Sequence, residues 1–590
     1  MATTNINVFF TGKTLSIPAY QRDYAWTGEN IDDLFEDIEE ALAVGSSHYI
    51  GTFILCQTSS GEPFSVVDGQ QRLTTLTILL DALIKKVTDP AIQAHYKNTF
   101  INNPISGQKF KLLGANNLFF QNLLLGEDVI PVSDGQERLK TAYYWIKGRA
   151  EELYKNGGQK IILRWLDAIS KFEALEFIEV NEGKAIRMFQ TVNDRGVLLS
   201  KIDIVKSLLV YYSNRYLDKI NNLDTYIATQ FGEVFRSFSQ LKNLAKEPGY
   251  LIHNINNDLF DEDSILRYHY LSYQKFPSDN NLGGSYKARV DDVLSLFLKP
   301  ALKDLRNTPK DLKDFIKDYT DDLLKFFQGL EALIKDTRKD RNAYIFWVIQ
   351  NPSATLYPLL IRLHLMDFLK EIGSIKNNNR TLYELIELTD MRAFKFGGNP
   401  QADIFNLTRN LSISDVNTVA KALLDFCASK MSNDDMKSKL ISEKMYANSG
   451  IKRMLLAIED QYVKLAKRPQ LKISDLVKLN IANLTVEHIF PQDPENNFSV
   501  RNHGFRSHDE YLKYQDILGN LILLENTVNI ACGNASPTEK MNHPRMYLRS
   551  AMQAVIALRA QYPQGIIFKK QDMIGRSSDM AKIIIEYWHI

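Results

Sequence analysis

The sequence predicts a multidomain protein that is mainly α-helical, with α/β parts at both ends. Short apolar, strand-like stretches alternate with helical patterns up to about residue 205, long amphipathic segments with few strand signals fill residues 206–470, and short strands followed by helices return in residues 471–590. A chain of 590 residues has room for several hydrophobic cores. We therefore expect three parts, at 1–205, 206–470 and 471–590.

The first part has the alternation typical of an α/β or α+β domain. Apolar residues recur on one helical face from Asn30, and strands are expected at 49–55, 64–67 and 175–180. Helices are expected at 73–85 and 185–192, the second followed by the loop 193–196. Ser200 and Asp203 have the spacing of a helix capping box.

The middle part is expected to be all helix. Its clearest amphipathic segments are 312–334, 357–372 and 451–465, separated by polar loops such as 278–285 and 377–380. In the last part, residues 484–491 and 518–524 have the pattern of two strands, and Asn529 falls where a first helical turn would follow.

Composition excludes several classes of protein. With 71 basic and 70 acidic side chains the net charge is +1, so a nucleic-acid site must be local rather than a general basic coat. Cys56, Cys427 and Cys532 lack the spacing of a zinc site or a disulfide framework. No signal-peptide pattern and no long apolar run is present, so we expect a cytoplasmic protein without a membrane span.

Glu487 and His488 form the most informative dipeptide of the chain. A carboxylate beside a histidine offers a metal ligand and a general base at one place, as hydrolysis of a phosphodiester requires. Neighbours in a straight strand point to opposite faces, so a bend at the strand end is expected, and Pro491 is consistent with the pairing ending there. His503 and His508 lie in a polar loop, where we expect exposed side chains.

The series Glu487-His488-Ile-Phe-Pro491, Gly519-Asn520-Leu and Asn529 resembles the HNH branch of the His-Me finger nucleases, and more narrowly the DUF1524 domain. The resemblance implies a ββα-metal fold in which Glu487 and Asn529 hold Mg²⁺ or Mn²⁺ and His488 activates water. It also implies that Asn520 holds the histidine loop and that Lys540 lies near a phosphate. The alternative is that His488 and the asparagines are structural turn residues and that Lys540 is a solvated surface lysine.

Two amino-terminal segments have residues suited to nucleotides. Residues 17–26 place Tyr20, Gln21 and Arg22 in a loop with Tyr24 and Trp26, and such residues can stack on a base or, alternatively, cover a core. The strand at 64–67 runs into Asp68-Gly69-Gln70-Gln71-Arg72 and then a helix, which offers backbone N–H groups and a guanidinium to phosphate. In that turn Asp68 could carry Mg²⁺ and a glutamine could orient water.

These segments, together with Phe189-Gln-Thr-Val-Asn193-Asp-Arg195-Gly196, resemble the DUF262 domain, which is related to the ParB and sulfiredoxin fold. The resemblance implies binding and hydrolysis of a nucleoside triphosphate, with GTP, UTP, CTP and ATP all open. Asn193 and Arg195 would then reach the nucleotide, unless they serve only the structure of their loop.

A DUF262 domain and a DUF1524 domain in one chain resemble the GmrSD, BrxU and SspE group of anti-phage proteins. The resemblance implies an NTP-regulated, Mg²⁺-dependent endonuclease that recognises modified phage DNA, with the middle helices coupling the two ends. Two alternatives stay open: a nucleotide-switched DNA-binding protein without cleavage activity, and an RNA-cutting toxin. A single finger site cuts one strand at a time, so a double-strand break would require a homodimer or two successive nicks.

Overall fold

The computed structural model describes the chain in two compact units. Unit 1 contains residues 1–239 and 294–324, and unit 2 contains residues 240–293 and 325–590. The division into three domains at 205 and 470 stays a prediction. The described residues are 2–18, 21, 23–44, 48–112, 115–180, 185, 200–217, 222–273, 289–375, 378–398, 400–410, 415–479, 484–493 and 498–590.

Unit 1 is built on a mixed sheet that has six strands among the described residues, in the order β1-β8-β3-β4-β2-β7. The central strand β3 pairs in parallel with β8 and antiparallel with β4. The strands predicted at 49–55, 64–67 and 175–180 are confirmed as β3, β4 and β8. The strands are β1 (Ala2–Asn5), β2 (Leu15–Ser16), β3 (Tyr49–Cys56), β4 (Phe64–Asp68), β7 (Phe110–Lys111) and β8 (Glu173–Glu179), and a separate pair is β5 (Asn102–Asn103) and β6 (Gly107–Gln108).

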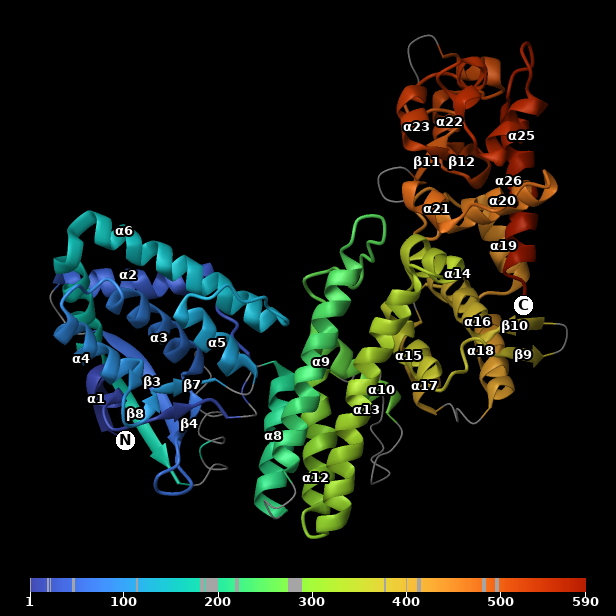
Figure 1. Cartoon of the computed structure of the whole chain (residues 1–590). Helices are drawn as coiled ribbons and strands as arrows, with labels where there is room; N and C mark the ends of the chain where they lie inside the picture. Colours follow the sequence, from blue (N-terminus) through green and yellow to red (C-terminus); the bar gives the residue numbers. More distant parts are fainter. Residues whose placement is uncertain are drawn as a thin grey trace. The chain divides into compact units, whose positions relative to one another are not determined.

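Helices pack around this sheet, and the long helix α6 lies against α2, α3 and α5 (Figure 1). Helix α3 begins at Gln70, three residues before the predicted start, because glutamine and arginine are good helix formers directly after Gly69. Ser200 caps α8, as predicted, by accepting a hydrogen bond from the Asp203 N–H. The helices are α1 (Ile6–Phe10), α2 (Gly28–Val44), α3 (Gln70–Ile84), α4 (Pro90–Phe100), α5 (Ala115–Leu125), α6 (Asp134–Lys171), α8 (Lys201–Tyr216), α9 (Leu223–Ala245), η4 (Val293–Leu298), α12 (Lys299–Leu305) and α13 (Pro309–Asp336), of which α9, η4 and α13 continue into unit 2.

Unit 2 is mostly helical up to residue 479. The helices predicted at 312–334 and 451–465 are confirmed as α13 and α20. The prediction of an all-helical middle is wrong at one place, because β9 (Ile372–Ile375) and β10 (Asn378–Thr381) form a hairpin where the sequence indicated the end of a helix and a polar loop. The helices are α10 (Glu262–Ser272), α11 (Val290–Asp292), α14 (Arg341–Tyr344), η5 (Ile345–Gln350), η6 (Ala354–Leu356), α15 (Tyr357–Leu365), α16 (Leu382–Thr389), η7 (Asp390–Phe396), α17 (Gln401–Asn410), α18 (Val416–Lys430), α19 (Asn433–Ser442), α20 (Ile451–Leu465) and α21 (Ile473–Leu479).

A two-stranded antiparallel sheet, followed directly by a short helix, forms the centre of the last region. Strand β11 (Leu484–His488) pairs with β12 (Leu521–Glu525), which places His488 opposite Leu521. The next helix, α23 (Asn526–Cys532), packs on both strands, and α20 packs on the same pair. The remaining elements are η8 (Val500–His503), α22 (His508–Tyr514), η9 (Leu518–Asn520), α24 (Pro537–Asn542), η10 (Tyr547–Arg549), α25 (Gln553–Gln561) and α26 (Lys570–Tyr587).

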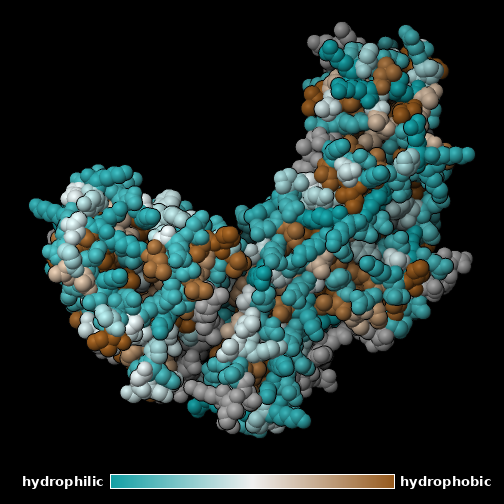
Figure 2. Space-filling model, in the orientation of Figure 1, coloured by the Kyte–Doolittle hydropathy of each residue, from teal (hydrophilic) through white to brown (hydrophobic). Residues whose placement is uncertain are grey.

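The visible surface is mostly hydrophilic, with scattered apolar residues (Figure 2). Across the described residues, each helix is too short or too polar to span a membrane. All three cysteines are buried and free of disulfide bonds, in agreement with their spacing in the sequence.

Candidate functional site

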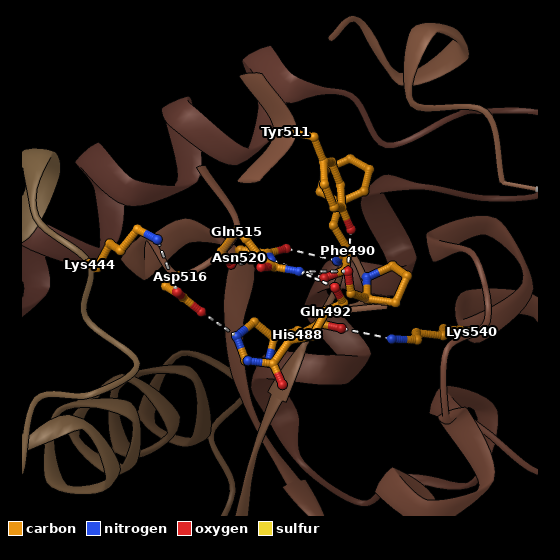
Figure 3. A network of polar contacts seen from close by, with 10 residues as sticks. Lys444, His488, Phe490, Gln492, Tyr511, Gln515, Asp516, Asn520 and Lys540 are labelled. Carbon is orange, nitrogen blue, oxygen red and sulfur yellow. Dashed lines mark hydrogen bonds and ion pairs between the residues drawn. The ribbon is translucent and has the colours of Figure 1, made fainter. Parts of the chain in front are cut away.

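Glu487 and His488 lie at the end of β11 and contact different groups. Because successive strand side chains point to opposite faces, the carboxylate and the imidazole each have their own partner. Glu487 lies beside Lys540. His488 lies beside Asp516 (Figure 3). The pairing of β11 ends at His488, as the predicted bend requires.

The His488 imidazole is buried and held by two groups. Its Nε2 lies 3.1 Å from Asp516 Oδ1, and the Tyr446 ring lies with its centroid 4.4 Å away. Burial lowers the pKa of His488 below its ordinary value, while the hydrogen bond to Asp516 opposes the shift. A neutral imidazole near neutral pH can accept a proton, as a general base must.

Lys540 contacts both residues of the dipeptide. Its Nζ lies 2.7 Å from Glu487 Oε1 and donates a hydrogen bond of 2.7 Å to the His488 carbonyl. Burial raises the pKa of Glu487, and the positive charge of Lys540 opposes that rise. The alternative of a solvated surface lysine is wrong, because Lys540 is 0% exposed. Its predicted place near a phosphate stays a prediction.

Asn520 holds the loop that follows His488. Its Oδ1 accepts a hydrogen bond of 2.7 Å from the Phe490 N–H, and its Nδ2 donates to the carbonyls of Phe490 and Gln515 at 3.1 and 2.6 Å (Figure 3). The side chain is fully buried in η9, immediately before β12. The geometry is that of a residue which fixes the histidine loop.

Asn529 lies in α23, the helix that packs on β11 and β12. It is half-buried, and its side-chain amide has no hydrogen bond to any described residue. Glu487 Oε1 is a buried oxygen that lies 2.7 Å from Lys540 Nζ. A carboxylate and an amide oxygen, completed by water, are a suitable ligand set for Mg²⁺, so these residues fit the metal that the resemblance implies. Within the described residues, no group of three or more His, Cys, Asp or Glu side chains is placed to hold a metal ion.

The other histidines of this region are outside the network. His508 is exposed, as predicted, at the first position of α22. The prediction for His503 is wrong, because its ring is buried against Phe498 and its Nδ1 lies 2.8 Å from the Phe568 carbonyl. Apolar packing from distant segments buries a ring that its polar neighbours in sequence suggested was exposed.

In unit 1, Asp68 and Gly69 form the turn between β4 and α3. The Gly69 backbone has a φ of 92°, and a Cβ there would lie 2.2 Å from the Phe53 ring, so only glycine fits. The Gly69 N–H donates to Asp68 Oδ1 at 2.7 Å, and α3 has no side-chain cap at its N-terminus. Burial raises the pKa of Asp68, and Arg72 opposes the rise.

Gln71 and Arg72 are engaged by the fold. Gln71 accepts a hydrogen bond of 2.8 Å from the Ala25 N–H and donates one of 3.1 Å to the Asp23 carbonyl. Arg72 donates to the carbonyls of two β3 residues, Ile50 and Thr52, both at 2.9 Å. Gln70, the first residue of α3, is buried. These contacts of Gln71 and Arg72 connect the start of α3 to the loop of residues 17–26 and to β3. Their predicted contact with a nucleotide stays a prediction.

The aromatic loop, residues 17–26, packs against unit 1 through Gln21, Tyr24 and Trp26. The Gln21 side chain donates to the Val67 carbonyl at the end of β4. Tyr24 is buried, with its hydroxyl 2.8 Å from Thr75 Oγ1, and Trp26 packs on the core, which confirms the structural alternative for Trp26. The remaining predicted nucleotide or DNA-sensing residues, Tyr20, Arg22, Asn193 and Arg195, lie outside the described residues.

Two family models match the chain, one at each end. Residues 6–210 match the GmrSD restriction endonuclease N-terminal domain, and residues 430–583 match the GmrSD restriction endonucleases C-terminal domain. The chain carries both domains of a GmrSD-type restriction endonuclease. None of the curated proteins compared with the chain matches it. The two GmrSD matches imply a nuclease and support a role in restriction.

The GmrSD C-terminal match begins at residue 430, before the boundary expected at 471, and includes a segment that the sequence did not indicate. Lys444 and Tyr446 lie between α19 and α20 and contact Asp516 and His488, respectively. Asp516 lies four residues before Asn520, so its place beside the Gly-Asn-Leu motif was the available signal. Nothing in the sequence around Lys444 marks it as part of the site.

Proposed function

We propose that this GmrSD-type protein is a Mg²⁺-dependent DNA endonuclease whose cleavage site lies at the end of β11. The observation that carries the proposal is the position of His488, buried at a strand end, paired through Nε2 and followed by a loop that Asn520 fixes. The order β11, β12, α23 supports an HNH finger with a ββα-metal arrangement.

Each residue has a role in this proposal. His488 takes a proton from the attacking water through the ring nitrogen that faces away from Asp516. Glu487 and Asn529 would hold the divalent ion, which would supply positive charge to stabilise the negative charge of the transition state. Lys540 holds the Glu487 carboxylate by an ion pair and the His488 carbonyl by a hydrogen bond.

We further propose that the amino-terminal domain binds and hydrolyses a nucleoside triphosphate and senses modified phage DNA. The uncapped N-terminus of α3, beside the Gly69 turn, suits a phosphate group. Asp68 lies at the same turn and would carry the Mg²⁺ of the nucleotide. Gln71 and Arg72 hold the two neighbouring segments around this turn.

The test uses purified protein with Mg²⁺ and either plain or glucosylated-hydroxymethylcytosine phage DNA, each with and without a nucleoside triphosphate. His488→Ala is expected to lower the cleavage rate by about 10²-fold or more, because it removes the general base. Equal cleavage by the variant, or no cleavage of either DNA by the wild-type protein, would overturn the nuclease proposal. DNA affinity that responds to nucleotide without strand breaks would instead identify a switched binding protein.

A further inference from the structure

Asp516 is the acidic side chain in contact with the His488 ring. It follows α22 and precedes η9, and its Oδ1 lies 3.1 Å from His488 Nε2. The Asp516 side chain is 21% exposed and the His488 side chain 7%, so the pair is largely shielded from water. A carboxylate accepts hydrogen bonds and does not donate them, so the Nε2 atom of a neutral His488 must carry the proton in this contact. The lone pair is then on Nδ1.

The backbone of Asp516 is fixed by a segment from another part of the chain. Its carbonyl accepts hydrogen bonds from the N–H groups of Met445 and Tyr446, at 2.7 and 3.3 Å. Lys444 forms an isolated antiparallel bridge with Ile517, and its Nζ lies 3.5 Å from Asp516 Oδ2. Met445 and Tyr446 thus hold Asp516 by backbone hydrogen bonds, and Lys444 holds it by its positive charge.

The same segment also contacts the imidazole. The Tyr446 ring is tilted by 56° to the His488 ring, with centroids 4.4 Å apart. His488 is therefore confined by Asp516 at Nε2 and by Tyr446 on one side of the ring, while β11 fixes its backbone. Confinement of this kind selects one ring orientation and one tautomer.

We propose that Asp516 is a positioning residue for the general base, and that the segment Lys444–Tyr446 holds it in register with His488. The inference rests on the proposed nuclease function and adds a residue set to it. Asp516 acts through His488: it keeps the proton on Nε2 and directs Nδ1 towards the attacking water. A residue with this role affects the chemical step and leaves DNA binding unchanged.

The test compares Asp516→Asn with Asp509→Asn, the same substitution at an exposed position of α22. An asparagine can donate to Nε2 as well as accept, so the tautomer is no longer fixed. Asp516→Asn is expected to lower kcat by about 10²-fold while KM for DNA changes by less than about 2-fold. Asp509→Asn is expected to match the wild type in both constants.

A second readout does not depend on cleavage. In protein labelled with ¹⁵N-histidine, the His488 signals, assigned by their loss in His488→Ala, should show an Nε2–H tautomer in the wild type and a mixture in Asp516→Asn. The inference is overturned by an Nδ1–H tautomer in the wild type, or by unchanged kcat in Asp516→Asn while His488→Ala is inactive. Absence of cleavage by the wild type would instead overturn the proposed function, and the tautomer would still decide the place of Asp516.

Discussion

Replacing Asn520 with alanine tests whether the histidine loop depends on one buried amide. The side chain makes three hydrogen bonds, to the Phe490 N–H and to the carbonyls of Phe490 and Gln515, and is 0% exposed. A buried backbone group left without a partner costs about 1–3 kcal/mol, so three such groups, partly rehydrated, give about 3–5 kcal/mol. That loss is a large share of the 5–15 kcal/mol by which domains are typically stable.

The assay combines urea unfolding with hydrogen exchange of peptides from 484–493. Asn520→Ala should lower the unfolding free energy of unit 2 and remove protection at the Phe490 N–H. Asn529→Ala is the matched control, because the half-exposed amide of Asn529 makes no hydrogen bond with described residues. It should cost less than about 0.5 kcal/mol yet abolish metal-dependent cleavage. A loss below 1 kcal/mol for Asn520→Ala, or equal losses for the two variants, would refute the reasoning.

Three further perturbations follow from buried or strained groups. Lys540→Met leaves the buried Glu487 carboxylate unpaired and should lower the unfolding free energy in urea by about 3–5 kcal/mol. Added Mg²⁺ or Mn²⁺ should stabilise this variant more than the wild type, and equal stabilisation contradicts a metal at that carboxylate. Gly51→Ala should lower the melting temperature more than Gly61→Ala, since both have positive φ but a Cβ at Gly51 would lie 1.7 Å from the Arg72 Nη1, whereas Gly61 has open space around it. Burial lowers the pKa of Lys206 from 10.5 to about 8. Between pH 8 and pH 10.5 the unfolded state therefore binds more protons than the folded state, so the unfolding free energy should rise by about 3 kcal/mol over this range. Lys206→Met should flatten this rise, as measured by hydrogen exchange of α8.

The order of elements around the site could be read from the sequence because each carries a local signal. Residues 484–487 alternate apolar and polar side chains, residues 521–524 are a short apolar run, and Asn526–Cys532 follows as a helix. Asn529 therefore falls in the predicted first helical turn. The family resemblance predicts that Asn520 holds the histidine loop, and its three hydrogen bonds have that geometry. Periodicity and turn residues are enough to predict the strands and the helix, whereas the role of Asn520 is predicted only by the resemblance.

Partners distant in sequence could not be read in the same way. Lys540 lies in a short helix among polar residues, a pattern that also describes a solvated lysine, and its burial depends on Glu487, 53 positions earlier. Asp516 is one of 70 acidic residues, and its contact with Tyr446 exists only once α20 is packed on β11 and β12. Tertiary packing, not local pattern, decides which charged groups face the site.

The turn after β4 shows why a motif of polar residues need not be a list of ligand contacts. The Arg72 guanidinium donates to two β3 carbonyls and lies 5.3 Å from the Phe53 ring centroid, so its replacement would disturb the sheet as well as any bound phosphate. Gln71 likewise holds the aromatic loop through Ala25 and Asp23. Loss of nucleotide binding in an Arg72 or Gln71 variant is therefore informative only if unit 1 keeps its stability. Asp68→Asn is the cleaner probe, because it removes a charge at the turn while an amide oxygen can still accept the Gly69 N–H.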